Sequence, residues 1–470
     1  MTTGKVFDGK PYTVNPHVAP SQCYDGTGRF DEGELAPAAT SRRGSLLYER
    51  IHVVKIAAGT ALMAFSVLAG WRPGEPVTTY WAGPGYPGDV KLDDRWAAQL
   101  KEGGFNTTWA TTPEELDVAA RHGLRVIYRY MGRLGNVEDP ASMEEFAKTI
   151  DKVKDHPALY VYSLLDEPPA TRFNALARYK EWIAARDPNH ATWVNLLPTY
   201  ANNKQLGVEG DIFRAYWEHV RMFAEIFHPE FLSYDHYQFI NNGDNPNYLL
   251  NLSVIRQSAA SQGVPFWNGV QACTWHPGSL ASPTAPRIPG PDELRFLVYT
   301  TVAYGAQGIY YYVYCHKGHK GSIVSLDGTP GPNFEALKTL NREFVSIARE
   351  LAPLRFTGAY VMGVRAPGVT PWCDRALLKI TPETPACELV PKKEMVDSTL
   401  VTRFEGNGTT YLMVVNLDYR KDRTLNVTAP CAVERFDALK RTWSPMGGST
   451  FDLSVVRGGG MLMRLAKQGK

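Results

Sequence analysis

Short apolar runs alternate with longer amphipathic segments through most of this 470-residue chain. The short runs are rich in β-branched and aromatic residues, as buried strands are, and the longer segments place apolar residues at helical spacing. The pattern predicts eight strands, at residues 77–82, 105–110, 124–130, 159–165, 191–197, 231–237, 265–270 and 308–314. It predicts a helix after each strand, at residues 93–103, 113–122, 142–154, 172–186, 212–227, 248–262, 292–306 and 333–351.

Eight strand and helix units in this order favour an α/β fold, a (β/α)8 TIM barrel over residues 71–355. Gly104, Gly123 and Gly263 stand just before strands, where a short loop after a helix needs a residue that tolerates positive φ. The alternative is an open doubly wound sheet. That fold usually has a glycine-rich phosphate-binding turn after its first strand, whereas residues 81–88 contain prolines and lead into no helix that would bind a phosphate.

The pattern changes near residue 356 to short alternating strands, for example at residues 399–404, 409–416, 423–427 and 460–465. Turn sequences such as Gly406-Asn407-Gly408 join them, as in hairpins. This predicts a small antiparallel β-sandwich over residues 356–470. We expect it to pack against the barrel and to carry no catalytic group.

The first 70 residues differ from the rest of the chain. Residues 1–50 are rich in Gly, Pro, Ser and Thr without periodic apolar positions, which predicts disorder. Residues 56–70 form a short apolar run with a basic flank, typical of an export signal or a membrane anchor. The alternative is a buried strand or helix of the fold. We expect a secreted, periplasmic or membrane-anchored protein.

Composition narrows the range of ligands. With 50 basic and 48 acidic side chains the formal net charge is +2, and no Lys/Arg cluster predicts nucleic-acid binding. We therefore expect a neutral substrate, and the 11 Trp and 24 Tyr residues suit stacking on sugar rings. The six cysteines show no zinc-ligand spacing, so we expect no metal and no cofactor. Nothing in the sequence indicates a protein partner.

Catalytic groups of a (β/α)8 barrel come from the carboxyl ends of its strands, and two predicted strands end in carboxylates. The fourth leads into Asp166-Glu167-Pro168, and the sixth contains Asp235. Hydrolysis of a glycosidic bond needs one carboxyl group to protonate the leaving oxygen and a second to attack the anomeric carbon or activate water. Glu167 and Asp235 are the candidates. Their alternatives are structural: an ion pair or a carboxylate at a helix N-terminus for Glu167, and an organiser of Arg129 or His236 for Asp235.

The Asp-Glu-Pro sequence at the fourth strand resembles the Asn-Glu-Pro or Asp-Glu-Pro signature of clan A glycoside hydrolases. The segments 234–237 and 266–271, with the barrel-then-sandwich layout, are similar to uncharacterised β-galactosidase-like bacterial proteins. The resemblance implies that Glu167 is the general acid/base and that Asp166 contacts a sugar hydroxyl. The sequence departs from the clan at the seventh strand, where Gln271 occupies the position of the nucleophilic Glu.

An amide cannot form a glycosyl ester, and three interpretations follow. Asp235 serves as nucleophile or as base for water, the substrate supplies its own nucleophile, or the protein is a carbohydrate-binding pseudoenzyme. Lyase or isomerase chemistry is less favoured, because no strand-end Lys or metal cluster stands out. Besides the two carboxylates, the sequence predicts these substrate contacts: Asp166, Tyr80, Trp109, Arg129, Tyr130, Asn195, His236, Tyr237, Asn268, Gln271, Trp275, Tyr312 and Tyr314.

Overall fold

A computed structural model describes residues 75–129, 140–275, 282–283, 285–382, 387–388 and 395–466. These residues belong to one unit, Ser66–Lys470. The export-like stretch at residues 56–70 and the predicted contact Tyr130 lie outside the described residues. Among the described residues, no helix combines the length and apolar character that a membrane span needs.

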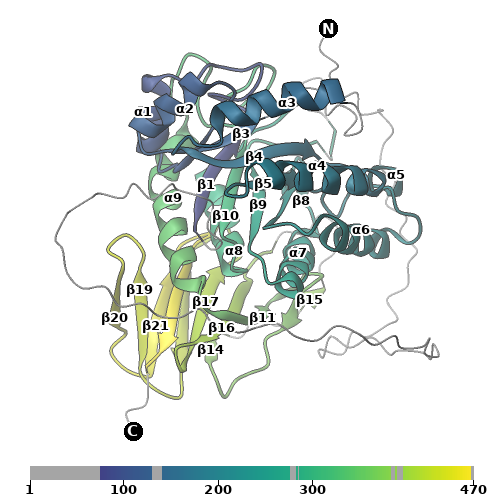
Figure 1. Ribbon diagram of the computed structural model, residues 1–470. Coiled ribbons are helices and arrows are strands. Elements are labelled where there is room, and N and C mark those ends of the chain that lie inside the picture. The colour runs from purple at the N-terminus through teal and green to yellow at the C-terminus, as the bar shows by residue number, and fades with distance from the viewer. Residues whose placement is uncertain are drawn as a thin grey trace, which may run out of the picture. The chain divides into compact units, whose positions relative to one another are not determined.

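Eight parallel strands form two four-stranded sheets (Figure 1). The amide of Asn106 donates to the Thr78 carbonyl at 3.2 Å, and the amide of Leu196 donates to the Ser233 carbonyl at 2.8 Å. Backbone hydrogen bonds thus link the two sheets at both pairs of edges. The first sheet has the order β2 (Thr107–Ala110), β3 (Arg125–Arg129), β4 (Leu159–Asp166), β5 (Ala191–Asn195), and the second β1 (Val77–Trp81), β10 (Gly308–Tyr312), β9 (Phe266–Gln271), β6 (Leu232–His236).

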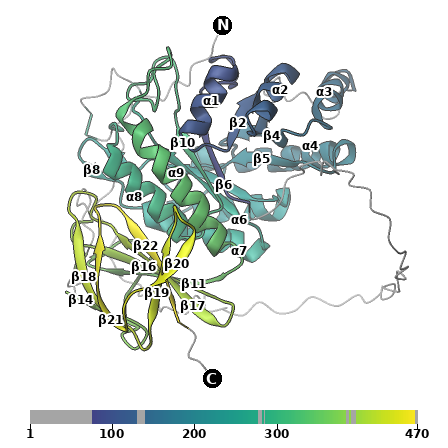
Figure 2. The same cartoon turned by 90° about the vertical axis from the view of Figure 1, so that its left-hand side faces the viewer.

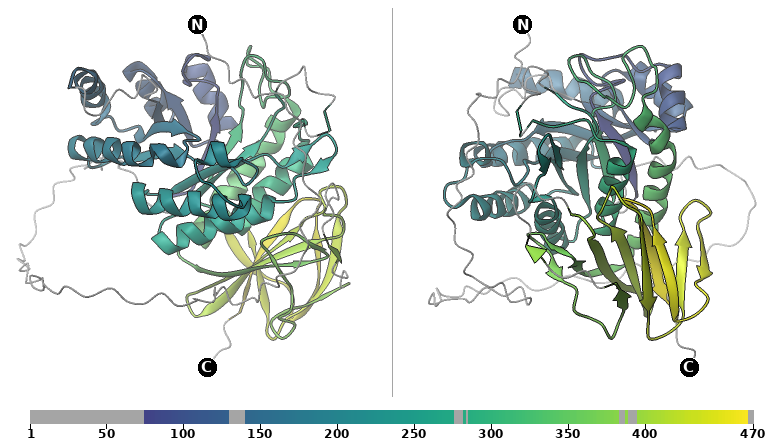
Figure 3. Two further views of the ribbon diagram at one scale, coloured as in Figure 1. Left: turned by 90° about the vertical axis from the view of Figure 1, so that its right-hand side faces the viewer. Right: turned by 180° about the vertical axis from the view of Figure 1, so that it is seen from behind.

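Helices follow the strands and lie outside them (Figure 3). Side chains cap several helix starts, and Asp93, for example, accepts a hydrogen bond from the Trp96 amide at 2.9 Å. The observed bounds agree with the predicted ones to within three residues: α1 (Asp94–Glu102), α2 (Pro113–Arg121), α3 (Pro140–Val153), α4 (Phe173–Arg186), α6 (Ile212–Phe227), α7 (Tyr248–Gln262), α8 (Pro291–Ala303) and α9 (Pro332–Leu351). The short helix α5 (Asn203–Leu206) and the two-residue strands β7 (Phe239–Ile240) and β8 (Gly243–Asp244) were not predicted.

Large aromatic side chains pack together between the two parallel sheets. Trp193 of β5 has the rings of Trp81, Trp109 and Trp267 within 5.5 Å of its own, measured between centroids. Tyr310 of β10 lies 5.5 Å from Trp193 in the same cluster. Rings of this size fit because two residues of the neighbouring strands β9 and β10 are glycines, Gly269 and Gly308. A Cβ atom on Gly269 would lie 2.1 Å from the Tyr310 ring, and one on Gly308 would lie 2.3 Å from the Trp267 ring.

Residues after Leu351 form two further sheets that share one buried apolar cluster, which includes Val401, Leu412, Val427 and Leu453. The larger sheet has the order β13 (Thr370–Pro371), β11 (Arg355–Met362), β16 (Thr399–Gly406), β17 (Thr409–Asn416), β22 (Gly460–Leu465), β19 (Val433–Asp437), β20 (Thr442–Pro445). The smaller has the order β14 (Lys379–Thr381), β18 (Arg423–Thr428), β21 (Thr450–Val455), and a separate pair joins β12 (Val364–Arg365) to β15 (Cys387–Glu388).

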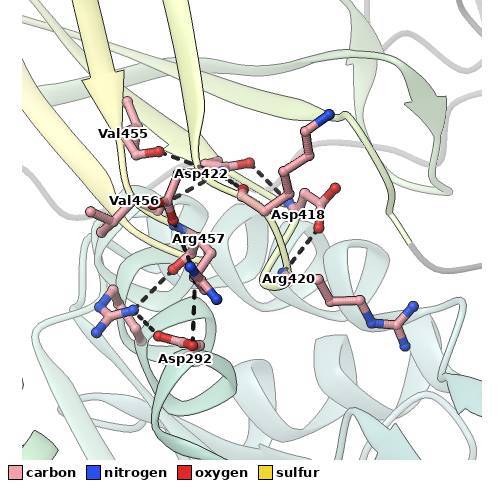
Figure 4. Close-up of polar contacts among 10 residues, drawn as sticks. Asp292, Asp418, Arg420, Asp422, Val455, Val456 and Arg457 are labelled. Carbon is pink, nitrogen blue, oxygen red and sulfur yellow. Dashed lines mark hydrogen bonds and ion pairs between the residues drawn. The ribbon is translucent and has the colours of Figure 1, made fainter.

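These sheets contact α8 and α9 (Figure 2). Trp443 of β20 donates to Glu350 of α9 at 3.2 Å. In the turn between β21 and β22, the Arg457 carbonyl accepts a hydrogen bond from Arg295 of α8, and the Arg457 guanidinium lies 3.0 Å from Asp422 (Figure 4). These polar contacts, and an apolar cluster that includes Phe296 of α8 and Met413 of β17, hold the C-terminal sheets against the helices that cover the parallel strands.

Candidate active site

Glu167 is the first residue after β4 and has φ of 48°, in the left-handed region that side chains with a Cβ rarely adopt. Its amide donates to the Asn195 carbonyl at 2.8 Å, which holds the backbone in this conformation. The residue is half-buried. Backbone strain of this kind occurs preferentially at functional sites, and no sequence pattern had indicated it here.

Asn195 at the end of β5 connects four strands through its side chain. Its Nδ2 donates to Asp166 of β4 at 3.1 Å, and its Oδ1 accepts from Ser233 of β6 at 3.3 Å and from Tyr310 of β10 at 2.5 Å. Asn195 is only 2% exposed, so these bonds are shielded from water. The arrangement fixes Asp166 beside Glu167.

Asp235 lies on β6 and is 4% exposed. Burial raises the pKa of the Tyr310 hydroxyl well above its ordinary value, and the negative charges of Asp235, Asp166 and Glu167 raise it further. The pKa of Tyr312, two residues along β10, is raised by burial and by the same three carboxylates. All three acids therefore lie within electrostatic range of the same two tyrosines. Hydrogen bonds agree with this: Asn195 binds the Glu167 amide through its carbonyl and Ser233, two residues before Asp235, through its side chain.

Three half-buried aromatic residues lie beside these carboxylates. The ring of Trp275 lies 4.7 Å from Tyr237 and 5.2 Å from Tyr312, and Tyr237 lies 5.2 Å from Tyr312. Tyr200, which is 39% exposed, accepts a hydrogen bond from the Tyr237 amide at 3.3 Å. Partly exposed rings of this kind can stack on the apolar face of a sugar. We call Tyr237, Trp275 and Tyr312 the aromatic wall.

Arg129 at the end of β3 places a cation within electrostatic range of Asp166. Its guanidinium lies 3.9 Å from the centroid of the Tyr86 ring and 6.0 Å from that of Trp81. Burial lowers the pKa of Arg129 to about 10, and the charge of Asp166 opposes this shift. The group therefore remains positive at neutral pH and balances part of the carboxylate charge.

Gln271 lies at the end of β9 but its amide is bonded to backbone. Its Oε1 accepts from the Phe239 amide at 2.9 Å, and its Nε2 donates to the carbonyl of Phe239 at 3.0 Å and to that of Arg287 at 2.5 Å. The side chain is fully buried. The structure thus shows both ends of the Gln271 amide engaged with the backbone of two loops.

Five other predicted contacts are hydrogen-bonded to strands, loops or helices of the fold. Trp109 is fully buried in the aromatic core, and the Tyr80 hydroxyl binds the Pro84 carbonyl at 2.6 Å. Strand β10 ends at Tyr312, so Tyr314 turns outward and donates to Gln99 of α1 at 3.0 Å. The two remaining residues face α7 and α8: His236 bonds Asn251 at 2.9 Å and Asn268 donates to Thr301 at 2.8 Å.

Three aromatic residues near the site, Tyr310, Tyr200 and Tyr86, were not among the contacts predicted from the sequence. Tyr310 could have been predicted from the sequence, because residues two apart in a strand face the same side and Tyr312 was a candidate. Tyr200 and Tyr86 lie in loops, where no periodicity predicts orientation. Within the described residues, no group of three or more His, Cys, Asp or Glu side chains is arranged to hold a metal ion.

No model of a known protein family matches the sequence, and no curated protein matches it. Solved structures that resemble the chain are glycoside hydrolases of several kinds. A β-galactosidase from the psychrophilic Marinomonas ef1 has 10% identity and a TM-score of 0.43 over 62% of this chain and 63% of that one. A β-galactosidase from the haloarchaeon Halorubrum lacusprofundi has 11% identity and a TM-score of 0.40 over 58% of each chain.

A glucosidase from Croceicoccus marinus has 10% identity and a TM-score of 0.42 over 85% of this chain and 98% of that one. The match spans less than two thirds of the length of either β-galactosidase. These identities and TM-scores lie below the level at which structural likeness establishes a shared family or function.

Proposed function

We propose that the protein is a glycoside hydrolase that uses Glu167 as general acid/base and Asp235 as the second carboxylate. In this proposal the eight parallel strands close into a (β/α)8 barrel, and the C-terminal sheets form a sandwich against it. The observation that carries the proposal is the hydrogen-bonded network in which Asn195 joins Asp166, Ser233 of β6 and Tyr310 at the strand ends that carry Glu167 and Asp235. The backbone strain at Glu167 and the aromatic wall support it.

The proposed chemistry breaks the bond between the anomeric carbon and the leaving oxygen. Glu167 gives its proton to that oxygen, and Asp235 either attacks the anomeric carbon or removes a proton from an attacking water. Asp166, held by Asn195, accepts a hydrogen bond from a sugar hydroxyl. The aromatic wall stacks on the sugar ring, and the near-zero net charge of the chain suits a neutral oligosaccharide or polysaccharide.

One observation favours a second candidate, a protein that binds carbohydrate without cleaving it. The amide of Gln271 is bonded to the Phe239 and Arg287 backbone, so β9 supplies no carboxylate to the site. Both candidates predict sugar binding, and only the hydrolase predicts turnover.

The test uses a panel of neutral glycans with reducing-end detection, and calorimetry for binding. The wild-type chain should hydrolyse at least one glycan. Glu167→Gln and Asp235→Asn should each lose activity by about 10²-fold or more while they retain binding. Glu181→Gln, an exposed position on α4, is the control and should match the wild type. Binding without turnover in the wild type would favour the pseudoenzyme.

We also propose that the protein acts outside the cytoplasm, on the basis of the export-like residues 56–70. N-terminal sequencing of protein from the culture medium, the periplasm and the membrane fraction tests this. Recovery of the chain in the cytosol with Met1 intact would contradict it.

A further inference from the structure

The segment that follows β6 contributes to the candidate site and is held from three sides. We call residues 237–245 the post-β6 segment; it begins with Tyr237 of the aromatic wall and contains β7 and β8. Its Phe239 exchanges two backbone hydrogen bonds with the Gln271 side chain, at 2.9 and 3.0 Å. The Arg287 amide donates to the Phe239 carbonyl at 3.2 Å, and the Arg287 guanidinium lies 4.8 Å from the Phe239 ring.

The third side is a single tyrosine from the C-terminal sheets. Tyr419 follows β17, and its hydroxyl donates to Asp244 Oδ1 of the post-β6 segment at 2.9 Å. Its ring lies 5.3 Å from Phe239 and 5.7 Å from Phe296 of α8. Tyr419 is 5% exposed and Asp244 is 4% exposed, so the bond is shielded from solvent.

The turn that carries Tyr419 is fixed on the C-terminal side. The carboxylate of Asp418 accepts from the Arg420 amide at 3.0 Å, and the Asp418 amide donates to the Asn416 side chain at 3.0 Å (Figure 4). Asn416 also donates to the Lys421 carbonyl at 2.8 Å. These bonds on both sides of Tyr419 leave its side chain little freedom to follow the post-β6 segment if that segment moves.

We propose that Tyr419 is a positioning residue of the candidate active site. It holds Asp244 and Phe239, and through them it sets the position of Tyr237 and of the end of β6, which carries Asp235. The catalytic part of this inference rests on the proposed glycosidase function, whereas the positioning of the segment does not. The C-terminal sheets thus complete the site from outside.

The charge on Asp244 makes the contact sensitive to pH. Burial raises the pKa of Asp244 to about 6, the Tyr419 hydroxyl bond, Arg287 and Arg420 lower it, and Glu293 raises it. Glu293 itself forms an ion pair with Arg287 at 2.5 Å. Within the described residues, Asp244 Oδ2 has no hydrogen-bond partner. At pH 8 Asp244 is ionised, so loss of the Tyr419 hydroxyl removes a hydrogen bond from a buried charge. At pH 5 the carboxyl group is mostly protonated, and the same loss costs less.

The experiment compares wild type, Tyr419→Phe and Tyr360→Phe in the full chain by hydrogen exchange with mass spectrometry. Tyr360 of β11 is the control, because its ring packs on Trp372 within the C-terminal sheets. At pH 8, Tyr419→Phe should reduce the protection of peptides covering residues 237–245 and 271–275 about tenfold or more, while β16 and β17 keep theirs. Tyr360→Phe should leave all of these peptides unchanged.

Two further experiments distinguish a positioning role from a general loss of stability. Protection in Tyr419→Phe should return at pH 5, and Asp244→Asn added to Tyr419→Phe should restore it at pH 8. In the active enzyme, Tyr419→Phe should lower kcat more at pH 8 than at pH 5. Unchanged protection of residues 237–245, or an equal loss in β16 and β17, would overturn the proposal even if the enzyme is active. An inactive wild type with the predicted exchange pattern would overturn only the catalytic part.

Discussion

Replacement of Gly269 by Ala tests whether the aromatic core and the candidate site form one packed unit. The new Cβ would lie 2.1 Å from Cζ and 2.3 Å from the hydroxyl oxygen of Tyr310. Ordinary contacts begin near 3.4 Å, so the ring must move by about 1.3 Å or more. Trp193 at 5.5 Å and Trp81 at 5.9 Å restrict that movement, and the bond from Tyr310 to Asn195 would break.

The expected cost combines overpacking with a lost buried hydrogen bond, about 2 to 4 kcal/mol in the free energy of unfolding. Urea unfolding followed by tryptophan fluorescence measures it, with the slope checked for two-state behaviour. Gly290→Ala is the control: its Cβ would meet no atom closer than 3.9 Å, so we expect only the cost of a poorer N-cap of α8, about 1 kcal/mol or less.

A double-mutant cycle sharpens the test, because Tyr310→Ala removes the ring that the new methyl group at Gly269 would strike. In that background Gly269→Ala should stabilise the protein by about 0.5 to 1 kcal/mol, since alanine loses less conformational entropy than glycine in a strand. The sign of the effect should therefore reverse. The same destabilisation in both backgrounds, or none in the wild type, would refute the packing argument.

Three other substitutions test separate parts of the structure. Because φ is 48° at position 167, Glu167→Gly should be about 0.5 to 1 kcal/mol more stable than Glu167→Gln. At Glu181 in α4, glycine should instead be less stable than glutamine. The same order of stabilities at both positions would show that the backbone at Glu167 is not strained. Gln271→Glu should lower the free energy of unfolding by about 3 kcal/mol or more at pH 8, because a carboxylate would face the carbonyls of Phe239 and Arg287. It should not increase glycoside turnover. A stable and more active variant would refute the role assigned to Gln271. In the wild type, the folded-state pKa of Asp244, about 6, lies above the ordinary value of 3.8, so the wild type loses stability as the pH rises from about 4 to 6. Asp244→Asn removes this loss and should raise the free energy of unfolding at pH 8 by up to about 3 kcal/mol. An equal gain at pH 4 and pH 8 would contradict this explanation.

The positions of most elements could be predicted from the sequence because apolar periodicity determines them locally. Helix α7 and strand β17 have the bounds that the pattern predicted, 248–262 and 409–416. Strands β7 and β8 were missed, because each has only two residues and Asn241 and Asn242 between them read as a loop. Their pairing depends on contacts with Gln271 and Tyr419, which are distant in sequence.

The candidate site was predictable only in part. The carboxylates at the ends of β4 and β6, with Tyr237 and Tyr312, follow from strand ends, which the sequence marks, whereas Trp275 was predicted from the long loop after β9. The orientations of Tyr80 and Tyr314 could not be predicted in this way. If a strand ends or twists one residue earlier or later than expected, the side chain points to the opposite face. The strained backbone at Glu167 and the bonds of Gln271 depend on tertiary contacts that no local pattern contains.

The most direct test of Glu167 as the general acid is to measure how kcat/KM of the Glu167→Gln variant depends on the leaving group of the substrate. It compares an alkyl glycoside, whose oxygen needs protonation, with the 2,4-dinitrophenyl glycoside of the same sugar, which leaves without it. If Glu167 is the general acid, kcat/KM should fall by about 10² to 10⁴ for the alkyl glycoside and much less for the dinitrophenyl one. An equal loss for both substrates, or no loss for the alkyl glycoside, would contradict the assignment of Glu167 as the acid.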